Sequence, residues 1–161
     1  MLKALKPDLH LASIFDIDLN KLWRSGYRNI IIDVDNTITA WNRHQAEKDV
    51  VEWFSRAREL GFGICLLSNN SQSTIMGLAS ELGVLASPTS GKPFSRAFKS
   101  ALKELSASAG NTVVIGDQIF TDILGGKRAG MYTILVDPID KREFIGTRLM
   151  RLLERVIAGR K

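Results

Sequence analysis

The sequence predicts a doubly wound α/β domain, in which helices cover both faces of a parallel β-sheet. Short apolar runs with the length of buried strands alternate with longer segments whose apolar residues recur at helical spacing. Glycine follows several of the helical segments, as is typical where helices end. Strands joined by right-handed helical crossovers form an open sheet of the Rossmann-like class.

The first half of the chain contains two strand-like runs. A short helix over 18–25 ends before Gly26 and precedes the first run, Asn29-Ile30-Ile31-Ile32-Asp33-Val34. Apolar residues at helical spacing then predict a helix over 46–60, which stops at Gly61 and leads to a second strand over 62–67. A strand, a helix and a strand of this length form one crossover unit.

The second half continues the alternation. Ser71 is a suitable N-cap, and Pro93 suits the first turn of a helix. The expected elements are a helix from Ser71 to Leu82, an extended segment over 84–86, a helix over 93–105, a strand over 112–115, a helix over 121–129, a strand over 132–136 and a last helix over 142–158.

We expect one domain covering residues 1–161. Of the 161 residues, 45% are hydrophobic and 24% are charged, and no repeat or low-complexity linker divides the chain. We find no signal-peptide pattern and no apolar stretch of membrane length. The single cysteine, Cys65, excludes an internal disulfide and a thiolate zinc cluster. We therefore expect a cytoplasmic protein, and peripheral contact with a membrane stays open. The net charge of +5 favours anionic partners.

Polar segments follow the predicted strands at the edge where ligands of such folds bind. Together they supply four carboxylates and one lysine, and closely packed carboxylates resist ionisation unless a cation lies among them. Oxygen ligands without thiolate or imidazole indicate Mg²⁺. The segments are Asp33-Val34-Asp35-Asn36-Thr37, Ser68-Asn69-Asn70, Gly91-Lys92-Pro93 and Gly116-Asp117-Gln118-Ile119-Phe120-Thr121-Asp122.

In this order, the four segments resemble the four motifs of the haloacid dehalogenase (HAD) superfamily of phosphohydrolases. Each motif alone is a weak signal, but the order, the spacing and the strand context are specific together. Further residues resemble the YqeG-like branch of subclass IIIA, which is related to phosphatidylglycerophosphate phosphatases. These residues are Pro7-Asp8, Asp16-Ile17-Asp18-Leu19 and Thr147-Arg148.

The resemblance implies phosphomonoester hydrolysis through an aspartyl phosphate. Asp33 would be the nucleophile, and Asp35 would protonate the leaving oxygen and then activate water. Mg²⁺ would be held by Asp33, the backbone carbonyl of Asp35, and Asp117. Asp122 would bind the metal, orient its water or merely cap the following helix. The implied phosphate-binding residues are Ser68, Asn69, Lys92 and, through the position of its loop, Thr37.

Many HAD phosphatases carry a cap domain inserted between these motifs, but the intervals here leave no room for one. An uncapped site cannot enclose a small metabolite, so we expect a large or surface-presented substrate. A phospholipid head group such as that of phosphatidylglycerophosphate is favoured, with phosphoprotein and nucleic acid as alternatives. In the last helix, Arg148, Arg151 and Arg155 share one face that either meets anionic lipid or is simply solvated.

Two other classes of function also fit parts of the pattern. A receiver-type switch combines Asp, Thr and Lys, but its lysine follows the last strands, whereas Lys92 precedes Asp117 here. A non-catalytic module could use the positive charge on RNA, yet no array of aromatic and basic residues is evident. Mg²⁺-dependent turnover of a phosphomonoester distinguishes the enzyme from both.

Overall fold

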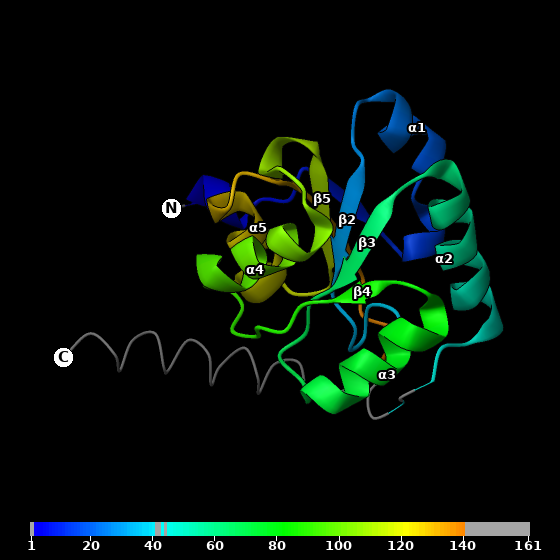
Figure 1. Cartoon of the computed structure of the whole chain (residues 1–161). Coiled ribbons are helices and arrows are strands. Elements are labelled where there is room, and N and C mark those ends of the chain that lie inside the picture. Colours follow the sequence, from blue (N-terminus) through cyan, green and yellow to red (C-terminus); the bar gives the residue numbers. More distant parts are fainter. Residues whose placement is uncertain (1, 41–42, 44, 141–161) are drawn as a thin grey trace.

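The computed structural model describes residues 2–40, 43 and 45–140. Six parallel strands form one sheet in the order β1-β6-β5-β2-β3-β4 (Figure 1). The strands are β1 Leu9–Leu11, β2 Asn29–Ile32, β3 Gly63–Leu66, β4 Leu85–Ala86, β5 Thr112–Gly116 and β6 Tyr132–Val136. The helices are α1 Leu19–Arg24, α2 Lys48–Leu60, α3 Gln72–Leu82, α4 Ser95–Leu105 and α5 Leu124–Arg128.

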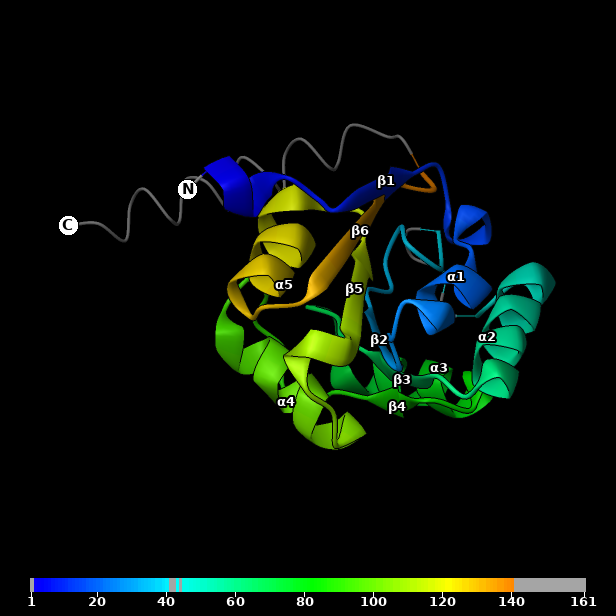
Figure 2. The same ribbon diagram turned by 90° about the horizontal axis from the view of Figure 1, so that it is seen from above.

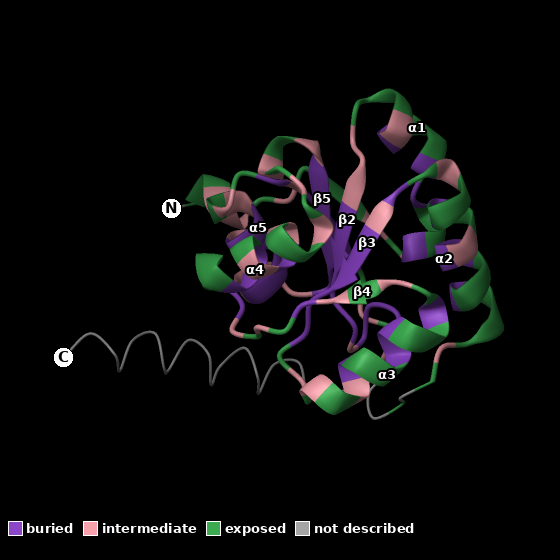
Figure 3. Ribbon diagram, viewed as in Figure 1, coloured by how far each residue is buried: buried purple, intermediate pink, exposed green. Residues whose placement is uncertain are grey.

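Helices cover both faces of the sheet, as the doubly wound prediction requires. Helices α4 and α5 lie on one face, and α1, α2 and α3 lie on the other (Figure 2). Successive side chains of β2 point to opposite faces of the sheet and pack against both helical layers. Ile30 and Ile32 pack with Trp53 and Phe54 of α2. Ile31 packs with Phe98 of α4 on the other face. The central strands are therefore buried on both sides (Figure 3).

Local signals in the sequence place several helix ends. The carboxylate of Asp18 accepts a hydrogen bond from Lys21 N at 3.0 Å and caps α1. Gly61 ends α2 in the left-handed conformation, with φ 104°. Ser71 occupies the N-cap position of α3, but its side chain makes no capping bond and instead lies 2.9 Å from Ser73 Oγ.

The fold class predicted from sequence is confirmed, with three local differences. Strand β1, which pairs with β6, was not predicted because its three residues show no clear periodicity. Helix α4 begins at Ser95 rather than at Pro93. The predicted helix over 121–129 is a π-helical turn, Ile119–Ile123, followed by the shorter α5. The helix expected over 142–158 lies outside the described residues.

The carboxyl ends of all six strands face the same edge of the sheet, because every pairing is parallel. The chain between β2 and β3 contains α2, and the chain between β3 and α4 contains α3 and β4. In the part of the chain that the structure describes, no further domain is inserted over this edge, and no helix is both long and apolar enough to cross a bilayer.

Candidate active site

A tight loop after β2 carries the first two acidic residues. Asp33 remains attached to the sheet, because its backbone N–H donates to Ile115 O at 2.9 Å. Beyond it, Val34 O accepts hydrogen bonds from the amides of residues 37–39 at 3.0–3.2 Å. Asn36 adopts a positive φ of 60°, which asparagine tolerates better than most residues. This turn brings the side chain of residue 37 back toward the strand end.

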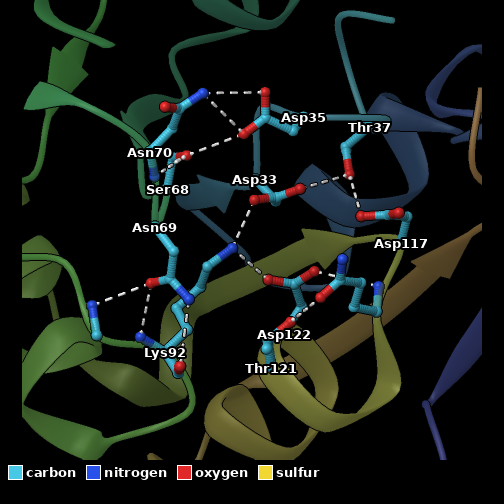
Figure 4. Close-up of polar contacts among 12 residues, drawn as sticks. Asp33, Asp35, Thr37, Ser68, Asn69, Asn70, Lys92, Asp117, Thr121 and Asp122 are labelled. Atoms are coloured by element: carbon cyan, nitrogen blue, oxygen red, sulfur yellow. Dashed lines mark hydrogen bonds and ion pairs between the residues drawn. The ribbon is translucent and has the colours of Figure 1, made fainter. Parts of the chain in front are cut away.

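The Asp33 carboxylate lies at the centre of a buried network (Figure 4). Its Oδ1 accepts a hydrogen bond from Lys92 Nζ at 2.5 Å, and Lys92 Nζ also lies 2.6 Å from Asp122 Oδ1. Thr37 Oγ1 lies 3.0 Å from Asp33 Oδ2 and 3.2 Å from Asp117 Oδ1. Residues from three of the four sequence segments therefore surround one carboxylate.

Asp122 reaches this network from within the π-helical turn. Its Oδ2 accepts a hydrogen bond from Gln118 N at 3.2 Å, which holds the side chain over the end of β5. Gly116 makes this approach possible, since a Cβ atom at that position would lie only 2.2 Å from the carboxylate carbon of Asp122. A side chain at residue 116 would thus displace Asp122.

The buried charges strongly perturb one another. Burial, together with the charges of Asp33 and Asp122, raises the pKa of Asp117 to about 9. Burial also raises the pKa of Asp122 to about 6, although the nearby Lys92 ammonium opposes this effect. Burial alone would lower the pKa of Lys92, but the carboxylates of Asp122 and Asp33 outweigh it and raise the pKa. The cluster therefore favours additional positive charge.

Asp35 belongs to a second polar group beside the first. Its carboxylate accepts hydrogen bonds from Ser68 Oγ at 3.5 Å and from Asn70 Nδ2 at 3.4 Å, on the side away from Asp117 (Figure 4). Ser68 Oγ in turn accepts a hydrogen bond from Asn70 N at 3.0 Å. The loop after β3 thus holds the carboxylate of Asp35 beside that of Asp33.

Asn69 connects the loop after β3 to the lysine loop. Its Oδ1 accepts hydrogen bonds from the backbone amides of Gly91 and Lys92, both at 3.0 Å, and its Nδ2 donates to Lys92 O at 3.3 Å. In this structure the Asn69 side chain fixes the backbone from which Lys92 extends. Its predicted role in binding phosphate directly stays a prediction.

Comparison with known proteins identifies the family. Residues 89–138 match the HAD-hydrolase-like family model. The chain is also 36% identical over 155 residues to the probable phosphatase YqeG of Bacillus subtilis, covering 96% of this chain and 90% of that protein. The chain belongs to the HAD superfamily of phosphatases. The alignment covers nearly the whole chain and therefore includes the four segments between residues 33 and 122. The similarity of this HAD phosphatase to its relative thus extends beyond an isolated motif.

Two further similarities extend the assignment. The HAD phosphatase is 26% identical over 157 residues to phosphatidylglycerophosphate phosphatase 1 of Arabidopsis thaliana, covering 91% of this chain and 45% of that protein. Among solved structures, the HAD-hydrolase YfnB of Bacillus subtilis, bound to magnesium, superposes with a TM-score of 0.57 at 16% identity. That match covers 73% of this chain and 90% of YfnB, and it supports the fold.

The residues of this HAD phosphatase fit a divalent cation, which enzymes of the superfamily generally use. One oxygen from each of Asp33, Asp117 and Asp122 lies within 4.8 Å of the others. The second oxygen of Asp117 is buried without a hydrogen-bond partner. Three carboxylates here face one ammonium group, that of Lys92, so a divalent cation would balance the charge. The Asp35 side chain is not part of this group; its predicted contribution was its backbone carbonyl.

The structure brings the predicted site residues to one edge of the sheet, in two connected groups. Asp33, Thr37, Lys92, Asp117 and Asp122 form the first group. Asp35 and Ser68 form the second, while Asn69 joins the loops. Two contributing residues lie within the segments selected from the sequence, but no role was predicted for them. Asn70 contacts Asp35, and Gly116 gives Asp122 its space. The Gly-Asp pair after an apolar strand was the available signal for Gly116.

Proposed function

We propose that this HAD phosphatase hydrolyses phosphomonoesters in two steps, with Asp33 as the nucleophile and Mg²⁺ as the metal. The observation that carries this proposal is the environment of Asp33. Its two carboxylate oxygens are engaged separately, one by the Lys92 ammonium and the other by the Thr37 hydroxyl. A buried carboxylate held in one orientation at the open end of a strand can attack a phosphorus atom placed above it.

The first step forms a bond between an Asp33 oxygen and phosphorus and breaks the bond from phosphorus to the ester oxygen. The leaving oxygen takes a proton from the Asp35 carboxylic acid. In the second step a water molecule returns a proton to Asp35 and attacks phosphorus, which releases inorganic phosphate and restores Asp33. The Ser68 and Asn70 contacts hold the Asp35 carboxylate beside the reacting group in both steps.

Cations offset the negative charge of the phosphoryl group. Lys92 is positioned to contact the phosphoryl oxygens, since its Nζ already lies beside Asp33. Asp33, Asp117 and Asp122, with the backbone carbonyl of Asp35, would hold Mg²⁺, which stabilises the developing charge and screens the nucleophile from the phosphate. Thr37 keeps the Asp33 and Asp117 carboxylates together on the metal side.

The substrate we propose is large or presented at a surface, with phosphatidylglycerophosphate as the leading candidate. Among the described residues no inserted domain covers the catalytic edge, so substrate bulk must exclude water there. The similarity to phosphatidylglycerophosphate phosphatase 1 of Arabidopsis thaliana supports a lipid phosphomonoester over a phosphoprotein or a nucleic acid.

The test of the chemistry is hydrolysis of p-nitrophenyl phosphate with Mg²⁺ and with EDTA. We expect turnover that needs the metal and is lost in Asp33→Asn, which keeps the shape of the side chain but not the nucleophilic charge. Asp49→Asn, an exposed position on α2, is the matched control and should keep full activity. Wild-type turnover in EDTA, or undiminished turnover in Asp33→Asn, would contradict the proposal.

A further inference from the structure

A cavity of about 300 Å³ lies beside the catalytic network. It is bounded by the segment after β1, the segment after β6 and the first turn of α2, so it opens at the same edge of the sheet as the acidic residues. Most of its lining is apolar. The apolar lining residues are Ala12, Ile14, Phe15, Val50, Pro138 and Ile139.

The cavity and the nucleophile share a wall. Thr37 lines the cavity, and its Oγ1 lies 3.0 Å from Asp33 Oδ2. The opposite wall is tied to the same loop, because Ile139 N donates to Asn36 O at 3.0 Å. The Thr37 side chain therefore connects the wall of the cavity to the Asp33 carboxylate.

Two large apolar side chains that line the cavity are exposed at the protein surface. Phe15 is 45% exposed and Ile139 is 52% exposed, although large apolar side chains are mostly buried elsewhere in the described chain. The charged lining group, Asp137, is paired with His10 at 2.8 Å. An exposed apolar pair around a mostly apolar cavity is typical of a binding site rather than of a solvated surface.

We propose that this cavity binds the apolar part of the substrate's leaving group, so that amphiphilic phosphomonoesters are preferred over polar ones. The inference rests on the proposed function, since it places the phosphate at Asp33. The cavity would add a second determinant of substrate specificity, separate from the catalytic residues. The segments after β1 and β6 form it.

The test measures affinity without requiring turnover. Methyl-, butyl- and octylphosphonate carry a stable carbon–phosphorus bond, and their binding in Mg²⁺ can be followed by isothermal titration calorimetry. We expect affinity to increase with chain length, by up to about fourfold for each fully buried methylene group. Ala12 is exposed and lines the cavity, so Ala12→Trp would place a large ring there. In this variant affinity should increase less with chain length, while the affinity for methylphosphonate should not change.

A matched pair of variants gives the control. Phe15→Ser should reduce the increase with chain length, whereas Leu85→Ser, which is also 45% exposed but lies on the edge strand β4, should not. Equal affinity for the three phosphonates in the wild type, or the same increase in every variant, would overturn the inference. Turnover of p-nitrophenyl phosphate by the same samples tests the Asp33 chemistry separately. If the enzyme hydrolyses p-nitrophenyl phosphate but its affinity for phosphonates does not depend on their chain length, the proposed function is retained and the proposed role of the cavity is rejected.

Discussion

Lys92 Nζ lies 2.6 Å from Asp122 Oδ1, and both side chains are almost completely buried. A buried ammonium is favourable only where carboxylates compensate its lost hydration. Here Asp33 supplies the second carboxylate, at 2.5 Å. The lysine that we propose to bind the substrate phosphate therefore also stabilises the acidic cluster before any substrate arrives.

Replacing Lys92 should affect both stability and catalysis. In Lys92→Met the three carboxylates lose their ammonium partner, and breaking a buried pair costs about 3–5 kcal/mol of unfolding free energy. We expect this loss in urea unfolding with EDTA, a partial recovery when Mg²⁺ binds the folded state, and no measurable phosphatase activity. Lys99→Met, at an exposed position of α4, should leave both stability and activity unchanged. An unaltered unfolding midpoint of Lys92→Met in EDTA would mean that the ion pairs contribute no net stability.

Asp117 should make the metal-free protein less stable as pH rises. Its pKa is raised from 3.8 to about 9, so between these values the folded state keeps a proton that the unfolded state releases. Stability then falls with increasing pH, by at most about 1.4 kcal/mol per pH unit. We expect the melting temperature in EDTA to fall between pH 6.5 and 8.5, and to fall less in Asp117→Asn.

Mg²⁺ should weaken this trend in the wild type, because the cation stabilises the ionised carboxylate in the folded state. The decline in melting temperature should therefore shrink at saturating Mg²⁺, while Asp117→Asn should respond weakly to the metal. Parallel pH profiles of the wild type and Asp117→Asn in EDTA would exclude Asp117 as the group responsible.

The sequence was sufficient to predict the fold and the gathering of the candidate residues at one edge of the sheet. The run Asn29–Ile32 is apolar on both sides because helices pack on both faces, and parallel pairing then forces the ends of β2, β3 and β5 to meet. Asp33, Ser68 and Asp117 follow those ends, so their proximity needs no information beyond strand order.

Local geometry was not predictable in the same way. The three residues of β1 form a strand only because β6 pairs with them, which is a tertiary effect. The π-helical turn arises where Asp122 must reach back over Gly116, and helical periodicity alone predicts a regular helix there. Ser68 and Asn70 hold the Asp35 carboxylate, and these long-range contacts cannot be predicted from sequence spacing.

Asn69 provides a test between two roles. If its side chain positions the lysine loop, as its bonds to Gly91 N and Lys92 N indicate, an acceptor oxygen is what matters. Asn69→Asp keeps that oxygen and loses only the longer bond from Nδ2 to Lys92 O, at 3.3 Å. It should therefore retain more activity than Asn69→Ala, whose kcat we expect to fall about tenfold, or about 1.4 kcal/mol in barrier. If Asn69 instead binds the phosphate directly, the added negative charge makes Asn69→Asp the worse variant and raises KM. Steady-state kinetics of the two variants decide between these roles.

The close packing of Gly116 against Asp122 predicts that one methyl group should disable the site. In Gly116→Ala the new Cβ would lie 2.2 Å from the Asp122 carboxylate carbon, so Asp122 must move away from Lys92. Overpacking of this kind costs about 1–3 kcal/mol of stability. A displacement of about 1 Å in a catalytic group costs roughly a hundredfold in rate.

Gly77→Ala is the matched control, because nothing lies within 4 Å of a Cβ at that position in α3. Alanine in a helix is favoured over glycine, so this variant should be about 0.5–1 kcal/mol more stable and fully active. Both variants add one methyl group, which would collide with Asp122 at position 116 but has no neighbour within 4 Å at position 77. Retention of wild-type kcat in Gly116→Ala would show that Asp122 can leave its place without consequence, and its assignment to the metal group would then be wrong.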